Sequence, residues 1–262
     1  MKNTLRTLIG TLVMCFALSG VCFAETVLEG DEIDYDFRTG QATVKGHVLL
    51  TRDDGSKVES AAGEYNTKSE SGRLTGGVVA TQPDGKATCN ILEVKEAGDH
   101  LTAIGNAVLK KQDKTLRANQ VEYYGKRKFM ETVGPWAQLS LDDGSTLDAA
   151  YINYDDNSGI ANAKNNVRIN STARNLTARG DNAIYNTKVE EGTIELIGNA
   201  RATQDGNTIT GNKLTLRGAG GKIAEGDGNV KLVYFPKPTE PKTGGTETLV
   251  AVKGSDQASN KA

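Results

Sequence analysis

The chain has 262 residues, a formal net charge of −2, 37% hydrophobic and 5% aromatic residues, and 30 glycines. Many glycines and few aromatic side chains argue against a thick globular core, and interspersed acids and bases without a basic stripe argue against nucleic acid as a partner. Outside the first twenty residues no window keeps a 3.6-residue apolar period, so we expect little helix.

The first predicted element is a secretory signal peptide over residues 1–24. Lys2 and Arg6 precede an apolar stretch that ends at Leu18, and small residues stand three and one positions before the expected cleavage after Ala24. Two alternatives stay open: lipid attachment at Cys22, and an uncleaved anchor, although the apolar stretch is short for a span of about 20 residues. Cleavage would leave Cys89 as the last cysteine, which we expect to be a buried, inert thiol.

Residues 28–235 contain seven repeats of about thirty residues each. One position in every repeat is Gly or Asn, the residues that best tolerate a positive φ. We therefore expect a backbone kink at each of these marks, which are Gly46, Gly76, Gly105, Gly134, Asn165, Gly198 and Gly228.

The positions two and four residues after each mark are apolar except at Gln138, which indicates one face of a strand that leaves the kink. A second series, mostly Tyr, ends a short alternating run in every repeat and indicates a second strand. In the fourth repeat, Ala137, Leu139 and Leu141 form a rival apolar face, so we expect a bulge there. Asp-Gly pairs between the runs, such as Asp205-Gly206, predict tight two-residue hairpins.

If both series point inward, one apolar strip runs the length of the stack. Such a strip is either sealed as a dry core or occupied by a linear apolar ligand, and the residues alone leave the two possibilities even. The predicted interior-lining, lipid-binding residues are Ile33, Tyr35, Val48, Leu50, Tyr65, Val78, Leu92, Val94, Ala107, Leu109, Val121, Tyr123, Trp136, Ile152, Tyr154, Val167, Ile169, Ile184, Leu196, Ala200, Leu214, Leu216, Val230 and Leu232.

No catalytic or metal-binding constellation is predicted. His47 and His100 have no Cys or His partner at metal-ligand spacing. Acid pairs such as Asp142-Asp143 occupy turn positions, where Asp caps its own backbone. We therefore expect neither an enzyme nor a cofactor. An enzyme acting on polysaccharide and a structural or adhesin-like stack with a sealed core remain as alternatives.

The repeat resembles a known one. The segments from Leu28 to Val48, from Leu116 to Tyr123 and from Ile197 to Ala202 are similar to the OstA-type repeat of the lipopolysaccharide-transport proteins LptA, LptC and the periplasmic domain of LptD. The resemblance implies a repetitive, antiparallel, twisted β-jelly roll of about 14 to 16 strands, open at both ends. It also implies a periplasmic location and an interior that carries the acyl chains of lipid A.

The family's partners are implied in the same way. They are lipopolysaccharide, LptC-like and LptD-like proteins joined by edge-strand pairing, and further copies of the chain joined end to end into a bridge between the membranes. The LptA type fits best, because an LptD chain would continue into a barrel and an LptC chain would keep an N-terminal anchor. The expected domains are a signal (1–24), the β-jelly roll (25–235) and a flexible polar tail (236–262).

Overall fold

The computed structural model describes residues 26–52, 55–83, 85–186, 188, 193–217 and 223–235. The predicted signal peptide and polar tail lie outside these residues. The described residues form one 17-stranded sheet. The only helical segments among them are two 3₁₀ turns in connections between strands, Glu96–Gly98 and Thr172–Arg174. Every strand pairing is antiparallel, so the predicted all-β class and antiparallel order are confirmed.

Most strands are ten to thirteen residues long, and six short ones occur as three pairs. Their bounds are β1 (Thr26–Glu29), β2 (Glu32–Asp36), β3 (Gln41–Arg52), β4 (Lys57–Asn66), β5 (Ser71–Gln82), β6 (Gly85–Lys95), β7 (His100–Lys111), β8 (Lys114–Tyr124), β9 (Phe129–Leu141), β10 (Thr146–Ala149), β11 (Tyr151–Asp155), β12 (Ile160–Ser171), β13 (Leu176–Asn186), β14 (Thr193–Gln204), β15 (Asn207–Arg217), β16 (Ile223–Asp227) and β17 (Lys231–Val233).

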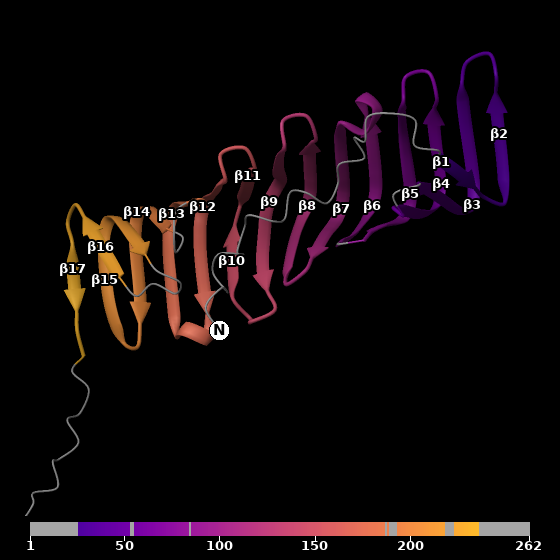
Figure 1. Cartoon of the computed structure of the whole chain (residues 1–262). Helices are drawn as coiled ribbons and strands as arrows, with labels where there is room; N and C mark the ends of the chain where they lie inside the picture. Colours follow the sequence, from indigo (N-terminus) through magenta and orange to yellow (C-terminus); the bar gives the residue numbers. More distant parts are fainter. Residues whose placement is uncertain are drawn as a thin grey trace, which may run out of the picture.

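Each pair of short strands makes one interrupted strand. β1 and β2 both pair with β3, β10 and β11 both lie between β9 and β12, and β16 and β17 both pair with β15. The molecule is thus a meander of fourteen strands, each joined to its chain neighbour. Figure 1 shows them side by side along an elongated body, with β2 at one end and β17 at the other.

A bulge bends the long strands near their middle. Between β7 and β8, for example, Gly105 and Asn106 lie opposite the single residue Asn119, and both have positive φ, 78° and 50°. A bulge of this kind raises the local twist and turns the strand. Positive φ occurs at all seven predicted marks, which confirms them as kinks.

The fourth bulge differs because its second residue is Pro135. In the other six repeats the mark and the residue after it both have positive φ, which the pyrrolidine ring of proline forbids. Three residues, Gly134 to Trp136, therefore stand opposite Asn119 instead of two. The extra residue shifts the side-chain alternation by one place. Trp136 faces outward, and Ala137 begins the inward face, as the predicted bulge implied.

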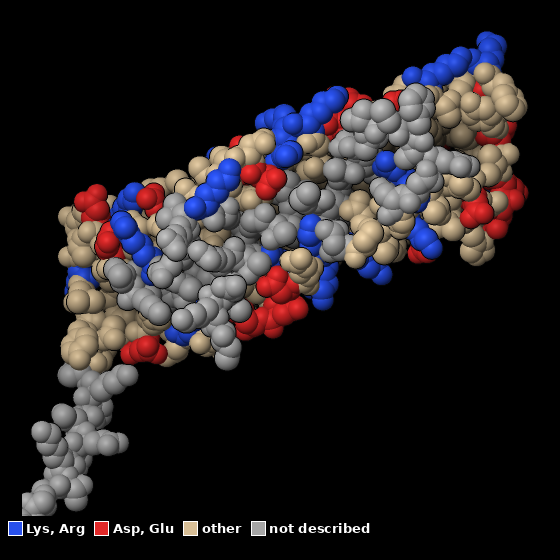
Figure 2. Space-filling model, in the orientation of Figure 1, with Lys and Arg blue, Asp and Glu red and all other residues tan. Residues whose placement is uncertain are grey.

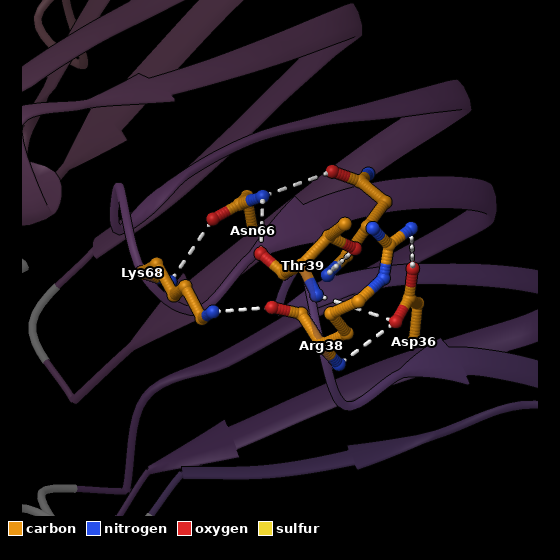
Figure 3. Close-up of polar contacts among 6 residues, drawn as sticks. Asp36, Arg38, Thr39, Asn66 and Lys68 are labelled. Carbon is orange, nitrogen blue, oxygen red and sulfur yellow. Dashed lines mark hydrogen bonds and ion pairs between the residues drawn. The ribbon is translucent and has the colours of Figure 1, made fainter.

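The turns at one edge of the stack bond to one another. Asp36 Oδ1 accepts hydrogen bonds from the backbone N–H groups of Arg38 (2.8 Å) and Thr39 (3.2 Å), which closes the first turn. The next turn is tied to it, because Asn66 Nδ2 donates to the carbonyl of Thr39 at 3.4 Å and Lys68 Nζ donates to the carbonyl of Arg38 (Figure 3). A similar bond occurs further along the stack, where Asn157 Nδ2 donates to the backbone carbonyl of Arg127 at 2.8 Å. These bonds join successive repeats.

The hairpins at the other edge differ in geometry, and two of them test the prediction. Gln204 pairs with Asn207, so Asp205-Gly206 is the predicted two-residue turn, with φ of 50° and 84°. The prediction is wrong after Leu141. There the Leu141 N–H donates to Ser145 O (2.9 Å), which gives a three-residue loop with only Gly144 left-handed. Two acidic residues precede that Gly, which fits a type I turn followed by one left-handed residue.

Candidate functional site: the apolar interior

One continuous cluster of buried apolar side chains runs along the stack, from Val44 near its first strands to Leu216 near its last. It exists because alternate residues of every strand point to the same side, and each bulge resets that alternation for the second half of the strand. Fourteen of the predicted lining residues are buried: Val48, Val78, Leu92, Ala107, Leu109, Val121, Tyr123, Ile152, Tyr154, Val167, Leu196, Ala200, Leu214 and Leu216.

Other predicted residues lie at the margins of this interior. Leu50, Val94 and Ile169 are half-buried and pack against the core cluster. Tyr35 and Tyr65 are also half-buried, and both pair across the sheet with the buried Ala42. The Tyr35 hydroxyl lies 3.1 Å from Thr67 Oγ1, so its polar end reaches the turn layer.

Two predicted lining positions are wrong. Trp136 is 44% exposed on the outer side because of the enlarged bulge. Ile184 is half-buried but lies between the buried Ala183 and Tyr185 in β13, so it faces the other side of the sheet. Adjacent residues of a strand cannot both point inward, and the structure buries the alanine and the tyrosine.

The residues predicted to line the two ends are exposed. Ile33 in β2 lies opposite the buried Val44, and Leu232 in β17 lies opposite Ile209, yet their exposed fractions are 50% and 65%. Both belong to the terminal strands, where the described chain places no further strand over them. Val230, also exposed, precedes β17. The apolar strip therefore reaches both open ends of the stack.

Small apolar hollows adjoin the interior. One of about 20 Å³ is lined by Val78, Cys89, Leu92, Leu109, Tyr123 and other apolar side chains. Another of about 20 Å³ lies further along, between Leu139, Ile152 and Tyr185. Each has room for about one water molecule. The two walls of the interior, which are the parts of the bent sheet on either side of the bulges, therefore lie close together here.

Several buried residues were missed by the sequence analysis. Leu116, Met130 and Leu147 lie deep in the core. Cross-strand pairing could have identified them, because a residue directly opposite a core residue points to the same side of the sheet. Leu116 pairs with Leu109 and with Leu139, and Met130 pairs with Tyr123 and with Tyr154.

Two reactive side chains are buried with the apolar ones. Cys89 is buried as predicted, and its burial raises the pKa of the thiol to about 11. Lys114 is buried at the start of β8, where desolvation lowers its pKa and Asp113 Oδ1, 3.5 Å from Nζ, opposes that shift. The thiol is therefore unreactive at neutral pH, since the thiolate is the nucleophile.

The two histidines lie apart from the interior. His47 is the left-handed residue of the first bulge, and its Nδ1 lies 2.8 Å from Asp31 Oδ2 on the surface. His100 stacks on Tyr124 and lies 3.3 Å from Glu122, whose pKa is lowered chiefly by a hydrogen bond from the Tyr124 hydroxyl. No group of three His, Cys, Asp or Glu side chains in the described part of the chain is placed to hold a metal ion.

The outer surface is charged and mixed. Figure 2 shows basic and acidic side chains interspersed over the visible face. Among the residues that the structure describes, no helix has the length and apolar character needed to cross a membrane.

Comparisons with known proteins give the following matches. The family model described as "LptA/(LptD N-terminal domain) LPS transport protein" matches residues 27–129 and 88–222. Among solved structures, LptH of Pseudomonas aeruginosa, described as the LptA-homologous periplasmic component of a lipopolysaccharide transport device, is 14% identical. The match covers 81% of this chain and 96% of that one, with a TM-score of 0.15. No curated protein matches the chain.

Proposed function

Since the chain belongs to the family of lipopolysaccharide transport proteins formed by LptA and the N-terminal domain of LptD, we propose that it carries lipopolysaccharide through the periplasm. The lipid A acyl chains would lie between the inner walls of the β-jelly roll. The observation that carries this proposal is the unbroken apolar cluster from Val44 to Leu216, which reaches both open ends. The chain acts as a carrier in this proposal, without catalysis.

The energetics favour acyl chains as cargo. Transfer of about twelve carbons from water into this interior contributes up to roughly 10 kcal/mol, at about 0.8 kcal/mol per methylene. Such a gain is large enough to hold the lipid firmly. Movement of the lipid along the stack then needs a push from another component.

The narrow hollows determine how the cargo enters. A space of about 20 Å³ holds no acyl chain, so binding separates the two walls. Small side chains such as Ala107 and Ala200 in the wall lower the cost of that movement, because they lose few packing contacts when the walls part. The bulges that bend each strand are the places where the angle between the walls changes.

The open edges support assembly end to end. In the described residues β1 and β2 pair only with β3, and β16 and β17 pair only with β15. An edge strand presents unpaired N–H and C=O groups, and apolar side chains are exposed beside both edges, including Ile33 and Leu232. Head-to-tail pairing of unlike edges gives open filaments. We propose that these edges join copies of the chain and LptC-like and LptD-like partners into a bridge.

The domain boundaries belong to the same proposal. Residues 1–24 act as a cleaved signal, residues 25–235 form the carrier domain, and residues 236–262 form a polar tail. A cleaved signal delivers the chain to the periplasm, as the function requires.

One alternative is supported by a specific observation. The small size of the hollows fits a sealed structural stack. Titration of the purified protein with lipopolysaccharide, read as displacement of a fluorescent fatty acid, separates the two functions. Saturable displacement by lipopolysaccharide and none by its deacylated form supports the carrier. Absence of fatty-acid binding and of displacement supports the sealed stack.

A further inference from the structure

The irregular fourth repeat leaves a hollow on the outer side of the sheet, with a volume of about 380 Å³. Its walls are mixed in character, and one lining residue, Ala149, also belongs to the buried core cluster. Its lining includes Pro135, Trp136, Asp148, Asn165, Asn166 and Arg168.

Two irregularities coincide to make this hollow. The three-residue bulge of β9 pushes Trp136 outward, and the neighbouring strand is interrupted between β10 and β11. At the interruption the Ala150 N–H donates to the carbonyls of Lys164 (3.2 Å) and Asn165 (3.1 Å), so the backbone turns toward β12. A large aromatic face is thereby left beside polar side chains. The chain contains one Trp, and this is its position.

A row of arginines continues outward from the hollow. Arg168 in β12 lies directly opposite Arg179 in β13, which lies directly opposite Arg201 in β14, and all three are exposed. Neighbouring strands are about 4.8 Å apart, and like charges directly opposite one another destabilise a sheet. No acidic residue in the described ranges forms an ion pair with any of the three. An anion bound along the row would relieve this repulsion.

Acidic and amide groups complete the site. Asp148 lies opposite Arg168 across the β10–β12 ladder, and its Oδ1 accepts a hydrogen bond from Gln138 Nε2 at 2.8 Å. That bond holds the carboxylate at the edge of the hollow. Asn165 and Asn166 also line the hollow, and their side chains carry both donors and acceptors.

We propose that this outer site binds a phosphorylated saccharide. The flat C–H face of a pyranose ring is apolar and packs on an indole ring, while its hydroxyl groups need donors and acceptors of the kind that Asp148, Asn165 and Asn166 provide. Guanidinium groups bind phosphate through two parallel hydrogen bonds, which assigns the anionic group to Arg168 and Arg179. The polar and aromatic groups of this site lie on the outer side of the sheet, so the proposal does not depend on the proposed carrier function.

The single Trp makes the site directly measurable. The experiment is a titration of the purified protein with glucosamine 1-phosphate, followed by the fluorescence of Trp136. We expect saturable quenching that Arg179→Gln and Arg168→Gln each weaken at least tenfold. The matched control is Arg73→Gln, because Arg73 is an exposed strand arginine in β5 and pairs with Glu93. This variant should bind glucosamine 1-phosphate with unchanged affinity. Calorimetry with Trp136→Ala, which lacks the fluorophore, should show a similar loss.

Other ligands distinguish the competing explanations. Unphosphorylated glucosamine should bind at least tenfold more weakly than its phosphate, and inorganic phosphate should also bind more weakly. Equal affinity for inorganic phosphate would mean an anion site without a sugar. Quenching by polyglutamate but not by the sugar phosphate would mean an acidic protein partner. Either result, or the absence of saturable quenching by the sugar phosphate, overturns the proposal. The probe has no acyl chain, so failure here leaves the carrier function standing.

Discussion

Leu116 pairs directly with Leu139 across the ladder between β8 and β9, and both side chains are buried. A two-residue bulge, as in the other repeats, would have placed Gln138 in that position. Pro135 prevents this bulge because it cannot adopt a positive φ. One backbone constraint therefore sets which face of β9 is apolar, and the same constraint forms the outer hollow.

Substitution of these side chains tests the shifted register. Leu139→Ala should lower the free energy of unfolding by about 2–5 kcal/mol, because it removes buried methyl groups and leaves a cavity. Trp136→Ala should change the free energy of unfolding by no more than about 0.5 kcal/mol, as expected for a surface position. Urea denaturation measures both. A larger loss for Trp136→Ala than for Leu139→Ala would contradict the assigned register.

The kinks are tested by a pair of glycines with matched φ. Gly76 (85°) and Gly55 (82°) both have left-handed backbones, but a Cβ on Gly76 would lie 2.6 Å from Ala61 Cβ, whereas a Cβ on Gly55 meets no atom within 4 Å. Gly55→Ala should lower the free energy of unfolding by about 1–2 kcal/mol through backbone strain alone. Gly76→Ala should cost clearly more, since the clash adds to the strain. Equal losses of unfolding free energy would mean that the close approach at the bulge contributes nothing.

Cys89 should resist thiol reagents in the folded protein. Burial raises the pKa of its thiol from 9.0 to about 11, so the thiolate fraction at neutral pH falls about a hundredfold, and access is blocked as well. A chain with Cys15→Ser and Cys22→Ser isolates this residue. Labelling followed by mass spectrometry should be slow under native conditions and complete in denaturant. Rapid native labelling would show that the wall near β6 opens readily.

The open edges should produce oligomers that grow with protein concentration. Leu232→Glu places a negative charge on the exposed face of β17 and should shift the protein toward monomer, because it meets the acidic β1–β2 edge of the next copy, which includes Glu32 and Asp34. Thr177→Glu, at an exposed position of β13, a strand that is paired on both sides, is the matched control. Sedimentation velocity measures the distribution. A monomer at every concentration would contradict bridging through these edges.

The sequence predicted the kinks and most of the core because both have simple local causes. Gly and Asn mark positive φ, and alternation marks an inward face. The sequence analysis was wrong where the burial of a residue depends on the strand beside it. Ala183, and not Ile184, lies opposite the buried Leu196 of β14. Exposure of Ile33 and Leu232 depends on whether another strand covers them, which no local pattern encodes.

The outer arginine row illustrates a different limit. Arg168, Arg179 and Arg201 are separated by 11 and 22 residues in the chain, and their spacing shows no motif. They become neighbours only through the register of two successive hairpins, β12–β13 and β13–β14, which the bulges set. The hollow beside them likewise requires two irregularities on adjacent strands.

The most direct test of the carrier function is photo-crosslinking in cells that make lipopolysaccharide. Crosslinkers at Val48, Leu109 and Ile169 point into or beside the apolar interior, and a crosslinker at Ile184 is an apolar control on the other face of the sheet. We predict crosslinks to lipopolysaccharide at the first three positions and none at Ile184. Absence of crosslinks at all three inward positions, or equal crosslinking at Ile184, would contradict transport through the interior.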